Sequence, residues 1–226
     1  ELAEAGMKNV RLNFSHGTHH SHKKIIEQIR KLNQSRHFPV ALLLDTQGPE
    51  IRNGDMEMTL IPGKRVCVNT PPNEETEGVL FINYPHLKED LEVGNCISLD
   101  GGLMCVKVLG KNERGLDCEV IDGGVVKGHR HVNLPGTIVK LPGITETDKQ
   151  DILFGVKQKV DVIALSFVRS SETILEVRDL LGEHAQHIKI IAKIENQEGV
   201  DRLVEIVQEA DGVMVARGDL GIEVEM

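Results

Sequence analysis

Short apolar runs that alternate with amphipathic segments are the feature that most limits how this chain can fold. Residues 9–14, 40–45, 160–167, 188–195 and 212–216 are each apolar nearly throughout, which is typical of parallel strands that are covered on both faces. Repetition of strand and helix along a chain indicates a parallel α/β fold.

The segments between these runs carry helix signals. Thr145 and Asp148 predict a helix start, and Thr173 begins a T-x-x-E pattern that predicts another. Near the end of the chain four apolar residues follow the i, i+3, i+4, i+7 spacing of one helical face, namely Val200, Leu203, Val204 and Val207.

From residue 48 to residue 141 the pattern changes to short alternating strands separated by turn residues such as Pro62-Gly63, Asp100-Gly101-Gly102 and Asp122-Gly123-Gly124. This spacing is typical of antiparallel β structure. We therefore expect an all-β domain at 48–141, inserted between the first part of an α/β domain at 1–47 and its continuation at 142–226.

The α/β segments provide five candidate strands, whereas a closed (β/α)8 barrel needs eight strands and roughly 250 residues. The preferred interpretation is a partial, incomplete (β/α)8 TIM-type barrel with an inserted all-β barrel lid domain over its mouth. A smaller, five-stranded doubly wound sheet is the alternative.

Composition excludes several classes of function. The net charge of −9 and the six aromatics, five Phe and one Tyr, disfavour nucleic acid as a partner. No apolar run approaches the roughly 18 residues that would span a membrane, and no secretory signal can be read in the residues given before the first strand. The four cysteines form no C-x-x-C pair, so zinc is not indicated and reduced thiols in the cytoplasm are expected.

Polar residues at strand ends are the candidates for chemistry, because barrel active sites lie at the carboxyl ends of the strands. Lys193 and Glu195 stand two residues apart in KIIAKIEN and share one strand face, while Asp219 follows the next strand. Two carboxylates favour Mg²⁺ or Mn²⁺ as the bound metal. A metal held by only two protein ligands keeps coordination positions open for substrate oxygens and water. Alternatively, Lys193 and Glu195 form only an ion pair at the barrel rim.

The first two strands end in similar chemistry. The segment VRLNFSHG brings Arg11, Asn13 and Ser15 to one strand end. The segment LLLDTQGPEIR adds Asp45 and Thr46, with Arg52 a few residues later. One carboxylate among neutral oxygens suits a monovalent cation, although Asp45 could instead cap a turn or a helix.

A tract of four histidines, His16, His19, His20 and His22, precedes Lys23 and Lys24. A transition-metal site is possible on residue type alone, but solvated side chains at a loop and helix start are the preferred interpretation. The chain contains neither a Walker-type nor a G-x-G-x-x-G phosphate loop.

Five segments in this order, RLNFSHG, LDTQGPEIR, VNLPG, KIENQEGV and MVARGDLG, resemble the pyruvate kinase family across the whole chain. The resemblance implies a (β/α)8 catalytic domain with a mobile β-barrel lid. It implies phosphoryl transfer from phosphoenolpyruvate to ADP, giving pyruvate and ATP with Mg²⁺ and K⁺. It also implies a homotetramer and a cytoplasmic location.

The resemblance carries roles onto individual residues. Glu195 and Asp219 match the magnesium ligands, Lys193 the cation on the transferring phosphoryl group, and Arg11 the arginine on the substrate phosphate. Gly218 and Asp219 match substrate contacts. The potassium ligands correspond to Asn13, Ser15, Asp45 and Thr46, and the nucleotide contacts to Asn13, Phe14, Ser15, His16, Arg52 and Arg130.

Two positions depart from the family pattern. Arg130-His131 replaces a Lys before a Gly, and Asp100-Gly101-Gly102 has one acidic residue where the family has two. Glu50 matches members that depend on potassium, since no ammonium stands in its place. The competing functions are a Mg²⁺-dependent phosphoenolpyruvate mutase or carbon–carbon lyase, and an inactive fragment.

Overall fold

The computed structural model describes residues 1–35, 38–70 and 78–224. The chain divides into two compact units. The α/β unit consists of Glu1–Pro49 and Pro142–Ala216, and the β unit of Glu50–Leu141 and Arg217–Met226.

The α/β unit is built on a five-stranded sheet whose strands all run parallel. The strands lie in the order β1 (Asn9–Asn13), β2 (Ala41–Asp45), β11 (Val162–Leu165), β12 (Lys189–Ile194) and β13 (Gly212–Val215). Each strand pairs with the next one of the unit along the chain. A doubly wound sheet reverses this order at its switch point, so the doubly wound alternative is wrong and the parallel α/β prediction is confirmed.

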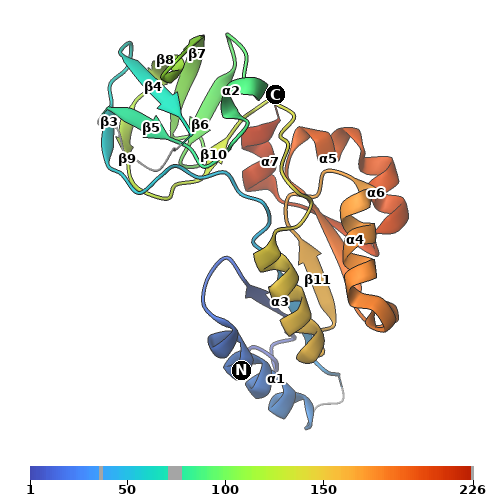
Figure 1. Cartoon of the computed structure of the whole chain (residues 1–226). Coiled ribbons are helices and arrows are strands. Elements are labelled where there is room, and N and C mark those ends of the chain that lie inside the picture. Colours follow the sequence, from blue (N-terminus) through green and yellow to red (C-terminus); the bar gives the residue numbers. More distant parts are fainter. Residues whose placement is uncertain (36–37, 71–77, 225–226) are drawn as a thin grey trace. The chain divides into compact units, whose positions relative to one another are not determined.

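Helices connect these strands: α1 (His19–Asn33), α3 (Glu146–Lys157) and α4 (Ser171–Leu181), followed by the 3-10 turn η1 (Gly182–Gln186). Helices α3 and α4 pack side by side (Figure 1). The predicted start at Thr145 is confirmed, because its hydroxyl accepts from the Asp148 N–H at 3.0 Å in a capping box. The start predicted at Thr173 is wrong: the N-cap residue of α4 is Ser170, which makes no side-chain capping hydrogen bond, and Thr173 is buried inside the first turn.

The last predicted helix is broken at Arg202 into α5 (Gln197–Asp201) and α6 (Leu203–Glu209). Ile206, which lies outside the apolar stripe, is fully buried, whereas Val204 is 75% exposed. Val200, Leu203 and Val207 are exposed too. The spacing thus identified a helix, but it did not identify which of its residues are buried in the fold, where α6 packs against α4.

The β unit contains two sheets. The larger has the order β10 (Val132–Asn133), β6 (Cys96–Leu99), β7 (Met104–Asn112), β8 (Gly115–Asp122), β4 (Arg65–Asn69) and β5 (Val79–Phe81), and the smaller pairs β3 (Met58–Leu60) with β9 (Gly124–Val126). Pairing is antiparallel except between β4 and β5. The stretch 48–141, predicted to be all β, also contains the short helix α2 (Leu87–Asp90). The β unit further includes the helix α7 (Arg217–Glu223) from the end of the chain.

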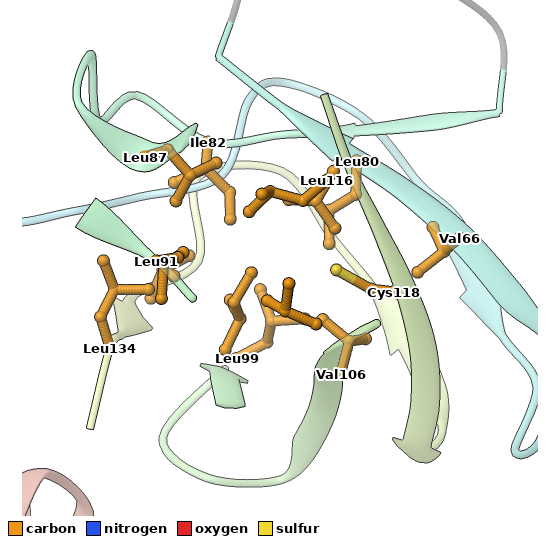
Figure 2. Close-up of a cluster of buried hydrophobic side chains, with 14 of the residues drawn as sticks. Val66, Leu80, Ile82, Leu87, Leu91, Leu99, Val106, Leu116, Cys118 and Leu134 are labelled. Carbon is orange, nitrogen blue, oxygen red and sulfur yellow. The ribbon is translucent and has the colours of Figure 1, made fainter. Parts of the chain in front are cut away.

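The β unit has a hydrophobic core of its own. Side chains from β4 to β10 and from α2 converge in it, and those labelled in Figure 2 are Val66, Leu80, Ile82, Leu87, Leu91, Leu99, Val106, Leu116, Cys118 and Leu134. Most of these residues are at most a few per cent exposed. Burial on this scale is what an independently packed β domain needs.

No helix in the described part of the chain is both long and apolar enough to cross a lipid bilayer. The four cysteines, Cys67, Cys96, Cys105 and Cys118, are free thiols. Burial raises the pKa of the Cys118 thiol to about 12, which keeps it protonated.

Candidate active site

The strand register brings the polar residues of the α/β unit to one edge of its sheet. Asn13 at the end of β1 pairs with Asp45 at the end of β2, and Asp45 pairs in turn with Ala164 of β11. Because the strands are parallel, their carboxyl ends meet at this edge. Residues that follow β11 and β12 are therefore neighbours of Asp45.

The Lys193 ammonium is the centre of this group. Its Nζ lies 3.1 Å from Asp45 Oδ1 and 3.1 Å from Glu195 Oε1. It also donates to Ser166 Oγ at 2.7 Å. Asp45 and Glu195 are each 1% exposed and Lys193 is 9% exposed, so the three charges are withdrawn from water and their interaction is only weakly screened.

Arg11 adds a second cation at the edge of the cluster. Its Nε donates to Asp45 Oδ2 at 2.5 Å, and its Nη2 contacts the same oxygen. More than half of the Arg11 side chain is exposed. The guanidinium is thus held at one end by Asp45 while its remaining donors are open to an incoming anion.

The turn after β11 completes the cluster, and the sequence analysis missed it. The Phe167 N–H donates to Glu195 Oε2 at 2.7 Å, and the Ser166 hydroxyl donates to the Thr46 carbonyl at 2.6 Å. The signal that could have found Ser166 is its position directly after an apolar strand, the rule that identified Asp45 and Glu195.

The loop after β1 is ordered by its own backbone and by β2. The Phe14 N–H donates to the Asp45 carbonyl at 2.9 Å, and the Ser15 N–H donates to Asn13 Oδ1 at 3.1 Å. The His16 N–H donates to the Asn13 carbonyl at 3.3 Å. The structure therefore brings Asn13 and Phe14 next to Asp45, and Ser15 next to Asn13, within one unit.

The histidine tract is engaged in contacts within the protein. His19 Nε2 lies 2.5 Å from Asp151 Oδ1, and its ring stacks on Phe154. His22 stacks on Phe14 and donates from Nε2 to the His16 carbonyl. Among the described residues, no group of three or more His, Cys, Asp or Glu side chains is placed to hold a metal ion.

Arg52 and Arg130 both belong to the β unit and lie on adjoining backbone. Arg52 bridges to His131, and the Asn53 N–H donates to the Arg130 carbonyl at 3.0 Å. Arg52 Nε donates to Glu50 Oε2 at 2.8 Å, and Arg130 Nη1 lies 3.7 Å from Asp100 Oδ1. Glu50 is therefore neutralised by a guanidinium, which the sequence analysis did not foresee.

Gly218 and Asp219 lie in α7, which clusters with the β unit, whereas Glu195 belongs to the α/β unit.

Burial lowers the pKa of His131, and the carboxylates of Glu50 and Asp219 oppose this shift. His131 is consequently neutral at pH 7, because its usual pKa is about 6.5.

The donor set fits hard cations. Each oxygen of the Glu195 carboxylate accepts a hydrogen bond, from Lys193 or from Phe167, and carboxylate oxygens are preferred ligands of Mg²⁺. Asp45 contacts Lys193 and Arg11, and the Ser166 hydroxyl, which donates to the Thr46 carbonyl, also lies beside it. The candidate metal ligands are all oxygens, which suits magnesium and alkali cations rather than zinc.

Comparison with known proteins agrees with the family resemblance of the sequence motifs. The family model described as pyruvate kinase, barrel domain, matches residues 1–226. The pyruvate kinase of Geobacillus stearothermophilus is 47% identical over 230 residues, covering 99% of this chain and 39% of that protein. Those of Staphylococcus aureus strains USA300 and NCTC 8325 are 45% identical over 229 residues, with the same coverage. The chain thus spans 39% of the length of the curated relatives that it matches, and it belongs to the pyruvate kinase family.

Proposed function

We propose that the protein transfers the phosphoryl group of phosphoenolpyruvate to ADP, and that this chain provides the charged centre of the active site. The observation that carries the proposal is the buried Lys193 ammonium held between Asp45 and Glu195 at the carboxyl end of a parallel sheet. Phosphoryl transfer through a loose transition state requires positioning and neutralisation of negative charge more than covalent chemistry.

In this proposal Lys193 neutralises charge on the transferring phosphoryl group and Arg11 binds the substrate phosphate through its open donors. Glu195 and Asp219 would hold Mg²⁺, and Asn13, Ser15, Asp45 and Thr46 would hold K⁺. These two cations would supply positive charge beside the phosphate groups. Gly218 would offer its backbone to the substrate.

Nucleotide contacts are proposed for residues 13–16 and for Arg52 and Arg130. The two arginines of the β unit are already engaged by Glu50 and Asp100. An incoming nucleotide phosphate would have to compete with these carboxylates, because each guanidinium has further donors but a single charge.

We also propose that residues 48–141 form an inserted β-barrel lid, while 1–47 and 142–226 are parts of the catalytic barrel. The separate hydrophobic core of the β unit supports this division. Closure of a lid would exclude water, which otherwise competes with ADP as the phosphoryl acceptor. A cytoplasmic location is consistent with four free thiols; a homotetramer stays a prediction.

The test is formation of pyruvate and ATP from phosphoenolpyruvate and ADP by the full-length protein, comparing wild type with Lys193→Met. We expect turnover to fall by about 10² to 10⁴, because the ammonium acts mainly on charge that develops during transfer. Lys189→Met is the matched control, since Lys189 lies on the same strand but is exposed and pairs with Asp211.

Three outcomes are informative. Loss of turnover in Lys193→Met alone supports the proposal. Equal activity of wild type and Lys193→Met contradicts the role of Lys193. Rearrangement or cleavage of the carbon skeleton without any need for ADP would instead favour the mutase or lyase function.

A further inference from the structure

The turn formed by Ser166 and Phe167 contacts both charged residues at the end of β12, although neither residue has a part in the proposed phosphoryl transfer. Ser166 accepts from Lys193, and Phe167 donates to Glu195. Both Ser166 and the Lys193 ammonium are buried. The turn is therefore placed to determine where these two side chains point.

The hydrogen-bond roles of Ser166 are determined by its neighbours on β2. Its hydroxyl has one proton, and the Thr46 carbonyl at 2.6 Å is the nearest acceptor for it. The Ser166 N–H donates to Thr46 Oγ1 at 3.1 Å. With its proton directed at Thr46, the hydroxyl oxygen presents lone pairs to Lys193 Nζ at 2.7 Å.

Backbone geometry and packing hold the turn in this position. Phe167 has a φ of 55°, a left-handed conformation that is unfavourable for a residue other than glycine. This conformation accompanies the N–H contact with Glu195. Gly48 packs directly against the turn, since a Cβ added there would lie 2.9 Å from Ser166 Cβ and 3.0 Å from Phe167 Cδ2.

The three acceptors around Lys193 differ in what else they can do. An ammonium has three N–H donors, and Asp45, Glu195 and Ser166 offer it three acceptor atoms. Both carboxylates are candidate ligands for cations, which would compete with Lys193 for their lone pairs. Ser166 is uncharged, and its orientation is set by Thr46.

We propose that Ser166 is a positioning residue for Lys193: it holds the ammonium in place while the Asp45 and Glu195 carboxylates serve bound cations. This inference rests on the proposed function of the site. It concerns a single hydrogen bond, from Lys193 Nζ to Ser166 Oγ. This bond is the contact that keeps the ammonium directed at the transferring phosphoryl group.

The kinetic test compares Ser166→Ala with wild type in the full-length protein. We expect kcat to fall by about 10- to 100-fold, because a displacement of about 1 Å costs this much, with the KM for phosphoenolpyruvate changed less than about 3-fold. Ser98→Ala is the matched control, since Ser98 is buried in β6 of the β unit and outside the cluster. An unchanged kcat in Ser166→Ala would overturn the proposal.

The second test needs neither activity nor metal. In protein with ¹⁵N-labelled lysine, freed of metal by chelation, we expect the slowly exchanging Lys193 ammonium signal to be lost in Ser166→Ala and kept in Ser98→Ala. A signal like that of wild type in Ser166→Ala would refute the positioning role, whatever happens to kcat. Should the alanine variant fail to fold, Ser166→Cys keeps a similar volume with a weak acceptor, and the same loss of signal is expected.

The two proposals can fail separately. If the wild-type protein makes no pyruvate from phosphoenolpyruvate and ADP, the proposed function is wrong. The ammonium signal alone then decides whether Ser166 positions Lys193.

Discussion

Removal of the Lys193 ammonium should destabilise the metal-free protein, not only impair turnover. Methionine replaces the lysine stem with little change in packing but leaves two carboxylates, each 1% exposed, without their shared cation. Asp45 keeps Arg11 and Glu195 keeps the Phe167 N–H, but the cation that the two carboxylates share is lost. The expected cause of the lower stability is a buried negative charge that is no longer compensated.

Removing one partner of a buried ion pair typically costs about 3–5 kcal/mol. With a urea slope towards the upper end of about 1–3 kcal/mol per M, the unfolding midpoint should fall by about 1–2 M. Lys189→Met removes a lysine that is 64% exposed from the same strand. It should cost about 0–1 kcal/mol, as exposed ion pairs do.

The assay is urea unfolding of the full-length protein in chelator, followed by far-ultraviolet circular dichroism, for wild type and both variants. Adding Mg²⁺ at about 100 times its Kd should restore about 2.7 kcal/mol to Lys193→Met if the metal binds only the folded state. An equal midpoint for wild type and Lys193→Met, or an equal fall in both variants, would refute the assignment of Lys193 as the shared countercharge.

Three further predictions concern the cations and pH. Asp219→Asn should raise the Mg²⁺ concentration for half-maximal activity by at least about 10-fold, and an unchanged titration would remove Asp219 from the metal site. In tetramethylammonium buffer activity should be weak and should return with K⁺. Glu50→Lys should lessen this dependence, whereas Glu50→Gln, which removes the negative charge without adding an ammonium, should not. A K⁺ response shared by wild type and Glu50→Lys would contradict the role of Glu50. Because the pKa of His131 is lowered in the folded state, the unfolded state binds more protons below pH 6.5, and the free energy of unfolding should fall on acidification by up to about 1.4 kcal/mol per pH unit. Urea midpoints measured between pH 5 and 7 should depend less on pH in His131→Gln than in wild type. An equal pH dependence in the two proteins would refute this role of His131.

Much of the α/β unit could be predicted because its signals are local. Apolar runs of strand length and the Thr145 capping box depend on nearby residues, and both were confirmed. The start at Thr173 was wrong because several hydroxyl residues lie close together, and the helix begins directly after Ser170. The spacing of Val204 and Val207 indicated a helix, but which residues are buried depends on the element packed against it, which is α4.

The sequence by itself determined which strand ends carry charge: Asp45, Lys193 and Glu195 are charged residues at the ends of apolar runs, and such patterns are readable because charge is rarely placed there without a partner. Only the tertiary structure decided that Lys193 contacts Asp45, 148 positions away along the chain, since this contact requires β11 to lie between β2 and β12. The same arrangement brought in Ser166, an uncharged residue whose position after an apolar strand is a weaker signal than a charge. Hydrogen bonds and ion pairs form between groups that are neighbours in space, and the order and register of parallel strands, not their spacing in the sequence, determine those neighbours.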